Sequence, residues 1–218
     1  MDHRFKFQTI VVDNGSTDST FQTLESEAQA GDIIIRNQES KGWGGGLKAG
    51  LLHAEGDYIL VFPSDLQYPL ESIRAVLDRL SEAKACSNVA IFSSRKFRRD
   101  GVLNSVRGRI WAGILRKVLG SNLEDLAGQL RAHSRIGFDY ETFPDSFLFD
   151  AHFALAWHKS KMPYEEVPVS FERRALGRSS NGNYISSSVR AIKAFVQYSR
   201  DWSHYWRVSD SGAEFNRD

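Results

Sequence analysis

The sequence predicts an α/β fold, in which crossover helices link the strands of a mostly parallel sheet. Short apolar segments rich in Val and Ile alternate with longer segments whose apolar residues recur at helical spacing. This alternation favours parallel strands joined by helices. Two of the apolar segments end in polar and acidic residues, at Asp13-Asn14 and at Ser64-Asp65. Because ligands bind at the carboxyl ends of the strands in an open α/β sheet, these residues mark the expected site.

The first half of the chain carries the regular part of this pattern. β-Branched residues crowd the end of the first expected strand, and Pro63 terminates the fully apolar third strand. Apolar residues three or four positions apart, such as Phe21 and Leu24 or Ile73 and Leu77, indicate helices. The expected strands cover residues 7–12, 33–35, 58–62 and 89–92, and the expected helices cover residues 17–30, 46–54 and 70–85.

The second half of the chain is less regular. Apolar residues at helical spacing predict helices over 107–119 and 148–159, and a short apolar run predicts a strand over 166–171. A polar segment over 172–183, with glycines, serines and arginines, is expected to form a loop. A helix rich in aromatic residues is expected over 186–206.

Composition excludes several classes of protein. The chain has 218 residues, 41% hydrophobic and 25% charged, which is typical of one soluble globular domain. A net charge of +1 does not favour nucleic-acid binding, and a single cysteine, Cys86, excludes an internal disulfide. No apolar run approaches the ~18 residues of a membrane-spanning helix, and the first residues carry no signal-peptide core. We therefore expect a cytoplasmic protein, with the option of peripheral contact with a membrane.

The segment Asp13-Asn14-Gly15-Ser16 lies where the first strand turns into a helix. Gly15 suits a tight turn, and the following helix N-terminus attracts negative charge. Asp13 and Asn14 can form hydrogen bonds with a base or a ribose. The alternative is an ordinary capping turn, in which Asp, Asn and Ser are common.

A glycine-rich segment follows, with four glycines among residues 42–46 and lysines at positions 41 and 48. Backbone N–H groups together with Lys41 or Lys48 can cradle a phosphate. The pattern is neither a Walker loop nor a dinucleotide fingerprint. The alternative is a turn before a helix that packs closely on the sheet.

The segment Pro63-Ser64-Asp65-Leu66-Gln67 follows the third strand. In an extended chain Asp65 and Gln67 point to the same side. Hard divalent cations prefer oxygen ligands of this kind and are often completed by substrate phosphates. The alternative is a polar loop after a buried strand.

Two later segments combine acids, arginines and hydroxyl groups. Asp125 and Arg131 flank a glycine, and Arg174 and Ser179 lie in the basic, hydroxyl-rich loop. Arginine and hydroxyl side chains suit phosphate binding. A solvated surface loop is the alternative for the second segment.

Taken together, these segments resemble glycosyltransferase family 2, and within it the branch of dolichol-phosphate-mannose-synthase-like enzymes. The shared pattern begins with V-V-D-N-G-S-T-D-S-T, K-G-x-G-x-G-L-K-A-G-L and G-D-Y-I-L-x-x-x-S-D-L-Q. It continues with Ser94-Arg95, with D-L-A-G-x-x-R from Asp125, and with E-V-P-V-S-F-x-x-R-x-x-G-R-S from Glu166. The resemblance extends from about Phe7 to Ser180.

This resemblance implies a glycosyltransferase A fold and inverting transfer from a UDP- or GDP-linked sugar, with Mg²⁺ or Mn²⁺ as cofactor. The implied acceptor is a polyprenyl phosphate or a sugar. We expect a catalytic domain over 1–185, followed by an aromatic amphipathic helix and tail over 186–218. The implied roles are donor binding by Asp13, Asn14, Gly15, Lys41, Ser64 and Asp65, metal binding by Asp65 and Gln67, phosphate or acceptor binding by Arg95, Arg131, Arg174 and Ser179, and catalysis by Asp65, Asp125 and Arg131.

The chain departs from the family pattern at three points. The family's opening strand, which ends in a Pro-Ala-Tyr-Asn-Glu-like segment and helps to bind the nucleotide, has no counterpart here, so we expect that strand and part of the donor site to be missing. Pro63 replaces the first acid of the usual Asp-x-Asp metal motif, and Gln129 replaces an aromatic residue. A non-catalytic relative that binds nucleotide sugars is therefore the main alternative function. A nucleotidyltransferase would need a basic glycine-rich loop near the N-terminus, which is absent.

The acceptor decides whether a general base is needed. A lipid phosphate is already an anion near neutral pH, whereas a sugar hydroxyl requires a base, for which Asp125 and Asp150 are the candidates. The helix expected over 186–206 has an apolar stripe, arginines and lysine, and nearby Trp and Tyr residues. Such a helix can lie in a membrane interface, or it can pack on the core or on a second subunit.

Overall fold

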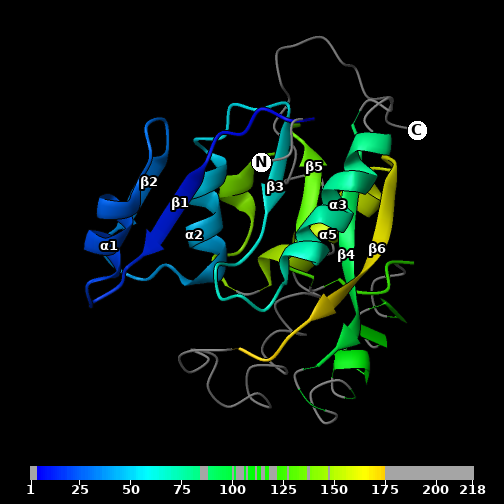
Figure 1. Ribbon diagram of the computed structural model, residues 1–218. Helices are drawn as coiled ribbons and strands as arrows, with labels where there is room; N and C mark the ends of the chain where they lie inside the picture. Colours follow the sequence, from blue (N-terminus) through cyan, green and yellow to red (C-terminus); the bar gives the residue numbers. More distant parts are fainter. Residues whose placement is uncertain are drawn as a thin grey trace.

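The computed structural model describes residues 4–83, 88–99, 101, 106, 108–110, 112–113, 116–117, 122–126, 128–136, 138–146 and 148–174. In chain order its elements are β1 (Ile10–Asn14), α1 (Thr20–Glu27), β2 (Ile33–Asn37), α2 (Gly42–Leu51), β3 (Tyr58–Val61), α3 (Leu70–Ala83), β4 (Ala90–Arg98), β5 (Arg131–Ser134), the short 3-10 helix η1 (Tyr140–Thr142), α5 (Phe149–Lys159) and β6 (Tyr164–Phe171) (Figure 1). The described positions between 106 and 117 are helical, within the helix predicted over 107–119.

The strands form two sheets. Strands β1 and β2 pair in parallel, and a second sheet has the order β3-β5-β4-β6. In the second sheet β4 and β6 are parallel, whereas β5 runs antiparallel to both β3 and β4. The α/β class is confirmed, but the sheet is mixed. Strand β5 was not predicted because its sequence, Arg-Ala-His-Ser, has no β-branched residue and no apolar run.

Two boundaries differ from the prediction for reasons that the packing explains. Strand β4 continues to Arg98 rather than ending at Phe92, because it pairs with β6 along that whole length, with an irregularity between Ser94 and Phe97. Helix α2 begins at Gly42 rather than at Gly46, because its first turn is held by a neighbouring loop. The other elements predicted within residues 7–92 shift by a few residues at their ends.

The core lies on the two faces of the four-stranded sheet. Phe92 faces a cluster with Phe153 and Trp157 of α5, whereas Ile91 faces a cluster with Val76 of α3, as expected from the alternation of side chains along β4. Nine consecutive residues of α5, 149–157, are buried, so this helix is enclosed rather than lying on the surface. The β1–β2 layer is less enclosed, and α1 has no buried residue.

Some sequence predictions lie outside the described residues. These are Cys86, Ser179, the boundary between 185 and 186, and the aromatic helix over 186–206. Within the part of the chain that the structure describes, no helix combines the length and the hydropathy that crossing a bilayer requires.

His133 of β5 is fully buried, and its environment makes the stability of the fold depend on pH. Its ring packs 4.6 Å from that of Phe153, and its Nδ1 lies 3.0 Å from the carbonyl oxygen of Ser134. Burial, reinforced by the charge of Arg131, lowers the pKa of His133 to about 3. An unfolded histidine has a pKa of about 6.5, so between these values only the unfolded state binds the proton.

We therefore predict that the contribution of His133 to stability is complete above pH 6.5 and falls by about 1.4 kcal/mol per pH unit between pH 6.5 and pH 3. Urea unfolding at pH 7.5, 6.0 and 5.0 would measure it, with His133→Gln as the variant that cannot titrate. The variant should lose less stability than the wild type over this range. Parallel losses in the two proteins would contradict the prediction.

Candidate functional site

The loop after β3 brings the predicted metal ligands next to a predicted phosphate ligand. Arg174 Nη2 donates a hydrogen bond of 2.8 Å to Asp65 Oδ2, and the backbone N–H of Gln67 donates one of 3.2 Å to Asp65 Oδ1. The side chains of Asp65 and Arg174 are 18% and 35% exposed. Ser64, directly before Asp65, is exposed. Both oxygens of the Asp65 carboxylate are therefore held in place, yet the pair remains open to solvent.

Residues 172–174, which we call the strap, fasten the end of β6 to this loop. The N–H of Glu172 donates to the carbonyl oxygen of Gln67 at 2.8 Å, and Gln67 Nε2 donates to the carbonyl oxygen of Glu172 at 3.1 Å. Between Asp65 and Gln67, Leu66 has a φ of 60°, in the left-handed region that a branched side chain rarely adopts. The strap thus holds a strained turn that carries the two candidate metal ligands.

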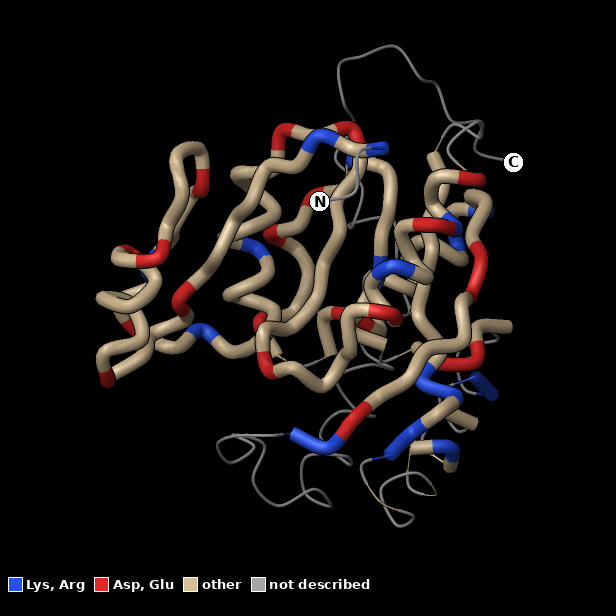
Figure 2. Tube along the Cα trace, in the orientation of Figure 1, with Lys and Arg blue, Asp and Glu red and all other residues tan. Residues whose placement is uncertain are grey.

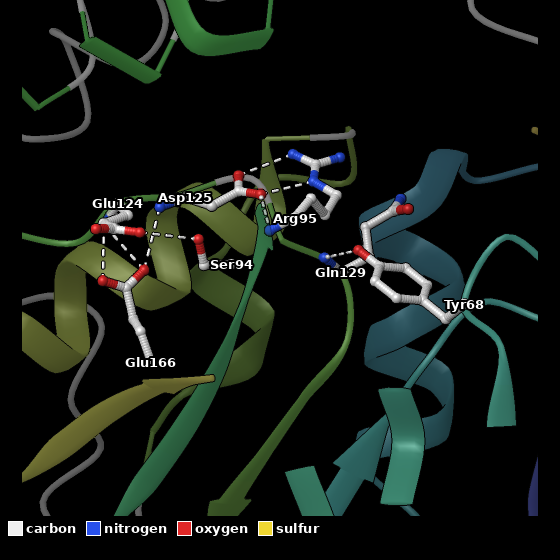
Figure 3. A network of polar contacts seen from close by, with 7 residues as sticks. All are labelled: Tyr68, Ser94, Arg95, Glu124, Asp125, Gln129 and Glu166. Atoms are coloured by element: carbon white, nitrogen blue, oxygen red, sulfur yellow. Dashed lines mark hydrogen bonds and ion pairs between the residues drawn. The ribbon is translucent and has the colours of Figure 1, made fainter. Parts of the chain in front are cut away.

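Arg95 and Asp125 form a second, more enclosed pair (Figure 3). Arg95 Nε and Nη2 donate to the two oxygens of Asp125 at 2.6 and 2.8 Å, and the side chains are 15% and 13% exposed. Burial disfavours the charge of Arg95, but the Asp125 carboxylate outweighs burial and raises the pKa of the guanidinium. Because both Asp125 oxygens accept hydrogen bonds from Arg95, this carboxylate is poorly placed to act as the predicted general base.

Glu166 of β6 fixes the backbone that carries Asp125 (Figure 3). Its carboxylate accepts hydrogen bonds from the N–H of Glu124, at 2.8 and 2.9 Å, and from the N–H of Asp125 at 3.1 Å. Ser94 Oγ donates to Glu124 at 3.1 Å. Burial raises the pKa of Glu166, while the two amide donors act in the opposite direction. This glutamate positions the loop, a role that its sequence context did not indicate.

Tyr68 and Phe171 join the two pairs into one site. The hydroxyl of Tyr68, one residue after Gln67, accepts a 3.2 Å hydrogen bond from the N–H of Gln129 (Figure 3). The Tyr68 ring packs edge-on against Phe171 with centroids 5.1 Å apart, and Arg95 Cζ lies 5.4 Å from the Phe171 centroid. The Asp65–Arg174 and Arg95–Asp125 pairs therefore lie at the same edge of the sheet, where β3, β4 and β6 end.

Arg131 does not lie where the resemblance implies. Its side chain is fully buried beneath α5 and forms an ion pair with Asp150, and its Cζ is 4.7 Å from the Phe153 centroid. Trp43 Nε1 donates to the other oxygen of Asp150 at 2.6 Å. Burial raises the pKa of Asp150, against the opposing effect of Arg131. In this structure Arg131 thus faces Asp150 in the core rather than the open edge of the sheet, and Asp150, the second candidate base, is buried with it.

Asp13, at the end of β1, has one committed and one uncommitted oxygen. Its Oδ1 accepts a 3.1 Å hydrogen bond from the N–H of Ser16, which is the capping turn offered as the alternative reading. Among the described residues its buried Oδ2 accepts no hydrogen bond, and Arg36 Nε lies 3.9 Å from it. Asp13 can therefore both hold the turn and accept a hydrogen bond from a ligand.

Asn14 is occupied by the protein itself. Its amide nitrogen donates to the carbonyl oxygen of Gly42 at 2.7 Å, and its amide oxygen accepts from Asn37 at 2.9 Å and from the N–H of Lys41 at 3.3 Å. Gly15 has a φ of 83°, and a Cβ there would collide with the backbone of Ser40. These two residues join β1, β2 and the start of α2, so they shape the donor side of the expected site.

The glycine-rich turn serves packing rather than the predicted phosphate cradle. The N–H groups of Gly44 and Gly45 donate to the carbonyl oxygen of Asp145 at 2.7 and 3.2 Å. A Cβ on Gly44 would collide with the backbone of Pro144, which explains why glycine is required there. Lys48 Nζ contacts Asp145 Oδ1 at 2.8 Å. The side chain of Lys41 is exposed and is the part of this segment left for a ligand.

Asp65 and Gln67 suit a divalent cation whose remaining ligands come from a bound phosphate compound. The donor set is one carboxylate and the Gln67 amide, whose nitrogen already donates to the strap. Within the described ranges, no cluster of three or more His, Cys, Asp or Glu side chains could enclose an ion. Mg²⁺ characteristically binds through one or two carboxylates together with substrate phosphates. The site therefore suits a metal bound to a diphosphate and does not suit a cation held by protein ligands alone.

The site residues that the sequence did not predict are those that hold other site residues in place. Trp43, Tyr68 and Glu166 each connect elements that lie far apart in the chain. Of these three residues, only Trp43 could be singled out from the sequence. A large aromatic side chain among glycines indicates that it packs against another part of the protein. The contacts of Tyr68 and Glu166 depend on β5 and on the loop before it, which sequence periodicity did not predict.

A family model and two curated relatives match overlapping parts of this chain. The family model described as Glycosyl transferase family 2 matches residues 3–140. Undecaprenyl-phosphate 4-deoxy-4-formamido-L-arabinose transferase of Edwardsiella ictaluri is 27% identical over 131 residues, which are 59% of this chain and 39% of that protein. The enzyme of the same name from Proteus mirabilis is 26% identical over 133 residues, 60% of this chain and 40% of that protein. The chain thus spans about two fifths of the length of these curated relatives.

Solved structures share the fold at low identity. Glucosyl-3-phosphoglycerate synthase from Mycobacterium tuberculosis, in complex with Mn²⁺, UDP-glucose and phosphoglyceric acid, superposes with a TM-score of 0.61 at 20% identity, over 93% of this chain and 70% of that chain. The same protein with phosphoglyceric acid alone gives a TM-score of 0.59 at 20% identity, over 88% of this chain and 67% of that chain. These likenesses support the predicted fold class.

The buried Arg131–Asp150 pair makes a prediction about stability. We predict that Arg131→Met lowers the free energy of unfolding by about 3–5 kcal/mol, because it leaves the buried Asp150 carboxylate without its counter-charge. Urea unfolding at pH 7.5 measures the loss. The double variant Arg131→Met/Asp150→Leu should regain a large part of it, since no charge is then left in the core. Equal losses in the single and double variants would contradict the assignment.

Proposed function

The chain belongs to glycosyl transferase family 2 and has the glycosyltransferase A fold, and we propose that it transfers a sugar with inversion from a nucleoside-diphosphate sugar to a polyprenyl phosphate. The observation that carries the proposal is the pairing of Asp65 with Arg174 at the exit of β3, where a carboxylate and a guanidinium stand ready for a metal and a diphosphate. The names of the curated relatives support a polyprenyl-phosphate acceptor.

The proposed donor is UDP- or GDP-linked and carries Mg²⁺ or Mn²⁺. The glucosyl-3-phosphoglycerate synthase complex with Mn²⁺ and UDP-glucose supports this on an equivalent fold. Asp65 and Gln67 would hold the metal, which when bound would neutralise charge on the leaving diphosphate. Arg174 would donate hydrogen bonds to the same diphosphate. Asp13, with its uncommitted Oδ2, is the residue we propose for the base or ribose.

The two candidate bases help to choose between the acceptors. Asp125 is held by Arg95 and Asp150 by Arg131, so neither is well placed to take a proton from a sugar hydroxyl. A phosphate monoester is already an anion near neutral pH and can attack the anomeric carbon without a general base. The arrangement therefore favours the polyprenyl phosphate over the sugar acceptor.

A basic edge of the molecule supports an acceptor at a membrane. Figure 2 shows Lys and Arg gathered near the ends of β4 and β6. Exposed Lys96 and Phe97 lie at the end of β4, and exposed Arg109 and Ile110 lie in the helix after it. A Cβ on Gly108 would approach Arg98 to 2.8 Å, which places that helix beside β4. Cationic and apolar side chains together suit anionic lipid headgroups, so we propose a cytoplasmic protein in peripheral contact with a membrane.

Residues 186–218, which lie outside the described part of the chain, are included in the proposed membrane contact. We propose a catalytic domain over 1–185 and an aromatic helix with tail over 186–218 that adds to membrane contact. Ser179, five positions after Arg174 in the sequence, remains a proposed phosphate ligand.

A second candidate function is nucleotide-sugar binding without transfer. Pro63 stands where an acid would complete the metal motif, and the remaining Asp65 is already paired with Arg174. Metal-dependent binding of UDP or GDP with no release of sugar would favour this candidate.

We predict that Asp65→Ala lowers transfer by about 10²-fold or more, because the leaving diphosphate loses its metal. The measurement is the formation of glycolipid from radiolabelled UDP- and GDP-sugars and undecaprenyl phosphate in detergent with Mn²⁺. Asp57→Ala is the matched control, since Asp57 is an exposed aspartate near the start of the same strand. Equal activity of Asp65→Ala and the wild type would contradict the assignment of Asp65.

We also predict that Lys96→Glu/Arg109→Glu weakens binding to phosphatidylcholine vesicles containing 30% phosphatidylglycerol by at least about tenfold, because each cation near an anionic surface contributes about 1 kcal/mol. Sedimentation of the full chain with vesicles measures the effect. Lys159→Glu/Lys161→Glu, which changes exposed lysines beyond the other end of the sheet, should bind like the wild type. Equal loss in both variants would show that net charge, rather than this edge, controls binding.

A further inference from the structure

We propose that Arg174 guards Asp65 against a bare divalent cation and releases it only to a cation that arrives with a diphosphate. This inference deepens the proposed function and rests on it for the identity of the diphosphate. It assigns the Asp65–Arg174 pair a role in selectivity: the pair distinguishes a metal–diphosphate complex from the free metal.

The first support is that the carboxylate has no idle oxygen. Arg174 occupies Asp65 Oδ2 at 2.8 Å, and the N–H of Gln67 occupies Oδ1 at 3.2 Å. A cation that approaches Asp65 therefore meets a guanidinium already bound to Oδ2 and must share the carboxylate with it or displace it. A bare cation would have only one carboxylate and one amide as protein ligands. Its binding would therefore gain little free energy from displacing the guanidinium.

The second support is that the described bonds between β6 and the Asp65 loop are made by residues other than Arg174. The strap is fastened by the backbone and side-chain bonds between Glu172 and Gln67, which do not involve Arg174. The turn at Leu66 stays in its left-handed conformation through those same bonds. The Arg174 side chain is 35% exposed, the larger fraction of the pair, so its guanidinium borders the solvent from which a ligand comes.

The third support is the balance of charge during the exchange. A diphosphate offers Arg174 a second anion, and a guanidinium binds phosphate oxygens as readily as carboxylate oxygens. When the complex binds, the cation takes Asp65 and the diphosphate takes Arg174. Each charge then exchanges one partner for another, and none is left unpaired. A bare cation would instead compete with Arg174 for the Asp65 carboxylate and would bring no anion for the guanidinium in return.

Thermodynamic linkage turns this exchange into a measurable coupling. If a diphosphate raises the affinity of the protein for the metal, the metal raises its affinity for the diphosphate by the same factor. Typical couplings of this kind lie between about fivefold and 150-fold. Removing the guanidinium should therefore tighten binding of the free metal and weaken binding of the complex.

The test compares two probes on the full chain by isothermal titration: MnCl₂ alone and the preformed manganese pyrophosphate complex. We expect the wild type to bind the complex at least about tenfold more tightly than MnCl₂. Arg174→Gln should bind MnCl₂ more tightly than the wild type and the complex more weakly. A purely structural role would lower both affinities together. Arg74→Gln, at an exposed position of α3, is the matched control and should match the wild type for both probes.

Three outcomes bear on the proposal. Unchanged affinity of Arg174→Gln for MnCl₂ would overturn it, as would a gain for MnCl₂ that persists in Asp65→Asn/Arg174→Gln. If Arg174→Gln does not fold, the wild type alone decides, and binding of MnCl₂ as tight as that of the manganese pyrophosphate complex would overturn the proposal. The pyrophosphate probe separates this proposal from the proposed function. A guarded site that binds manganese pyrophosphate but neither UDP nor GDP would sustain the first and refute the second.

Discussion

The buried ion pair between Arg131 and Asp150 is the interaction on which the site depends. It joins β5 to the start of α5, and the hydrogen bond from Trp43 to Asp150 extends it to the first turn of α2. Separating the two charges would leave one of them unpaired in the core, so the pair favours the arrangement in which these three elements meet. That arrangement sets the position of β5 between β3 and β4, and the loop that leads into β5 carries Asp125 to Arg95.

Three arginine–aspartate pairs then follow one another from the core to the surface. The side chains of Arg131 and Asp150 are 1% and 2% exposed, those of Arg95 and Asp125 are 15% and 13% exposed, and those of Arg174 and Asp65 are 35% and 18% exposed. A buried pair cannot exchange partners without leaving a bare charge in the core. The inner pairs therefore act as fixed supports. The outermost pair is the one that a ligand can reach and open, which is why the proposed chemistry is placed there.

The sequence predicted the first half of the fold well because apolar periodicity there is regular, as in the helix from Leu70 and the strand from Tyr58. It did not predict β5, since Arg131 and His133 are polar residues that only the assembled core makes acceptable. The motif around Asp65 was visible in the sequence, but its pairing with Arg174 joins residues that are 109 positions apart. The glycines of α2 were associated with phosphate, whereas their space is filled by residues 144 and 145, again a contact that local pattern does not contain.

The position of the metal would test the proposed site more directly than any other observation. Crystals of the full chain grown with MnCl₂ and UDP, and separately with MnCl₂ and GDP, would reveal manganese through its anomalous scattering. We predict a single strong peak coordinated by Asp65 and by the diphosphate of one of the two nucleotides, with Arg174 contacting phosphate instead of Asp65. A bound nucleotide with manganese elsewhere, or with the Asp65–Arg174 pair intact, would contradict it.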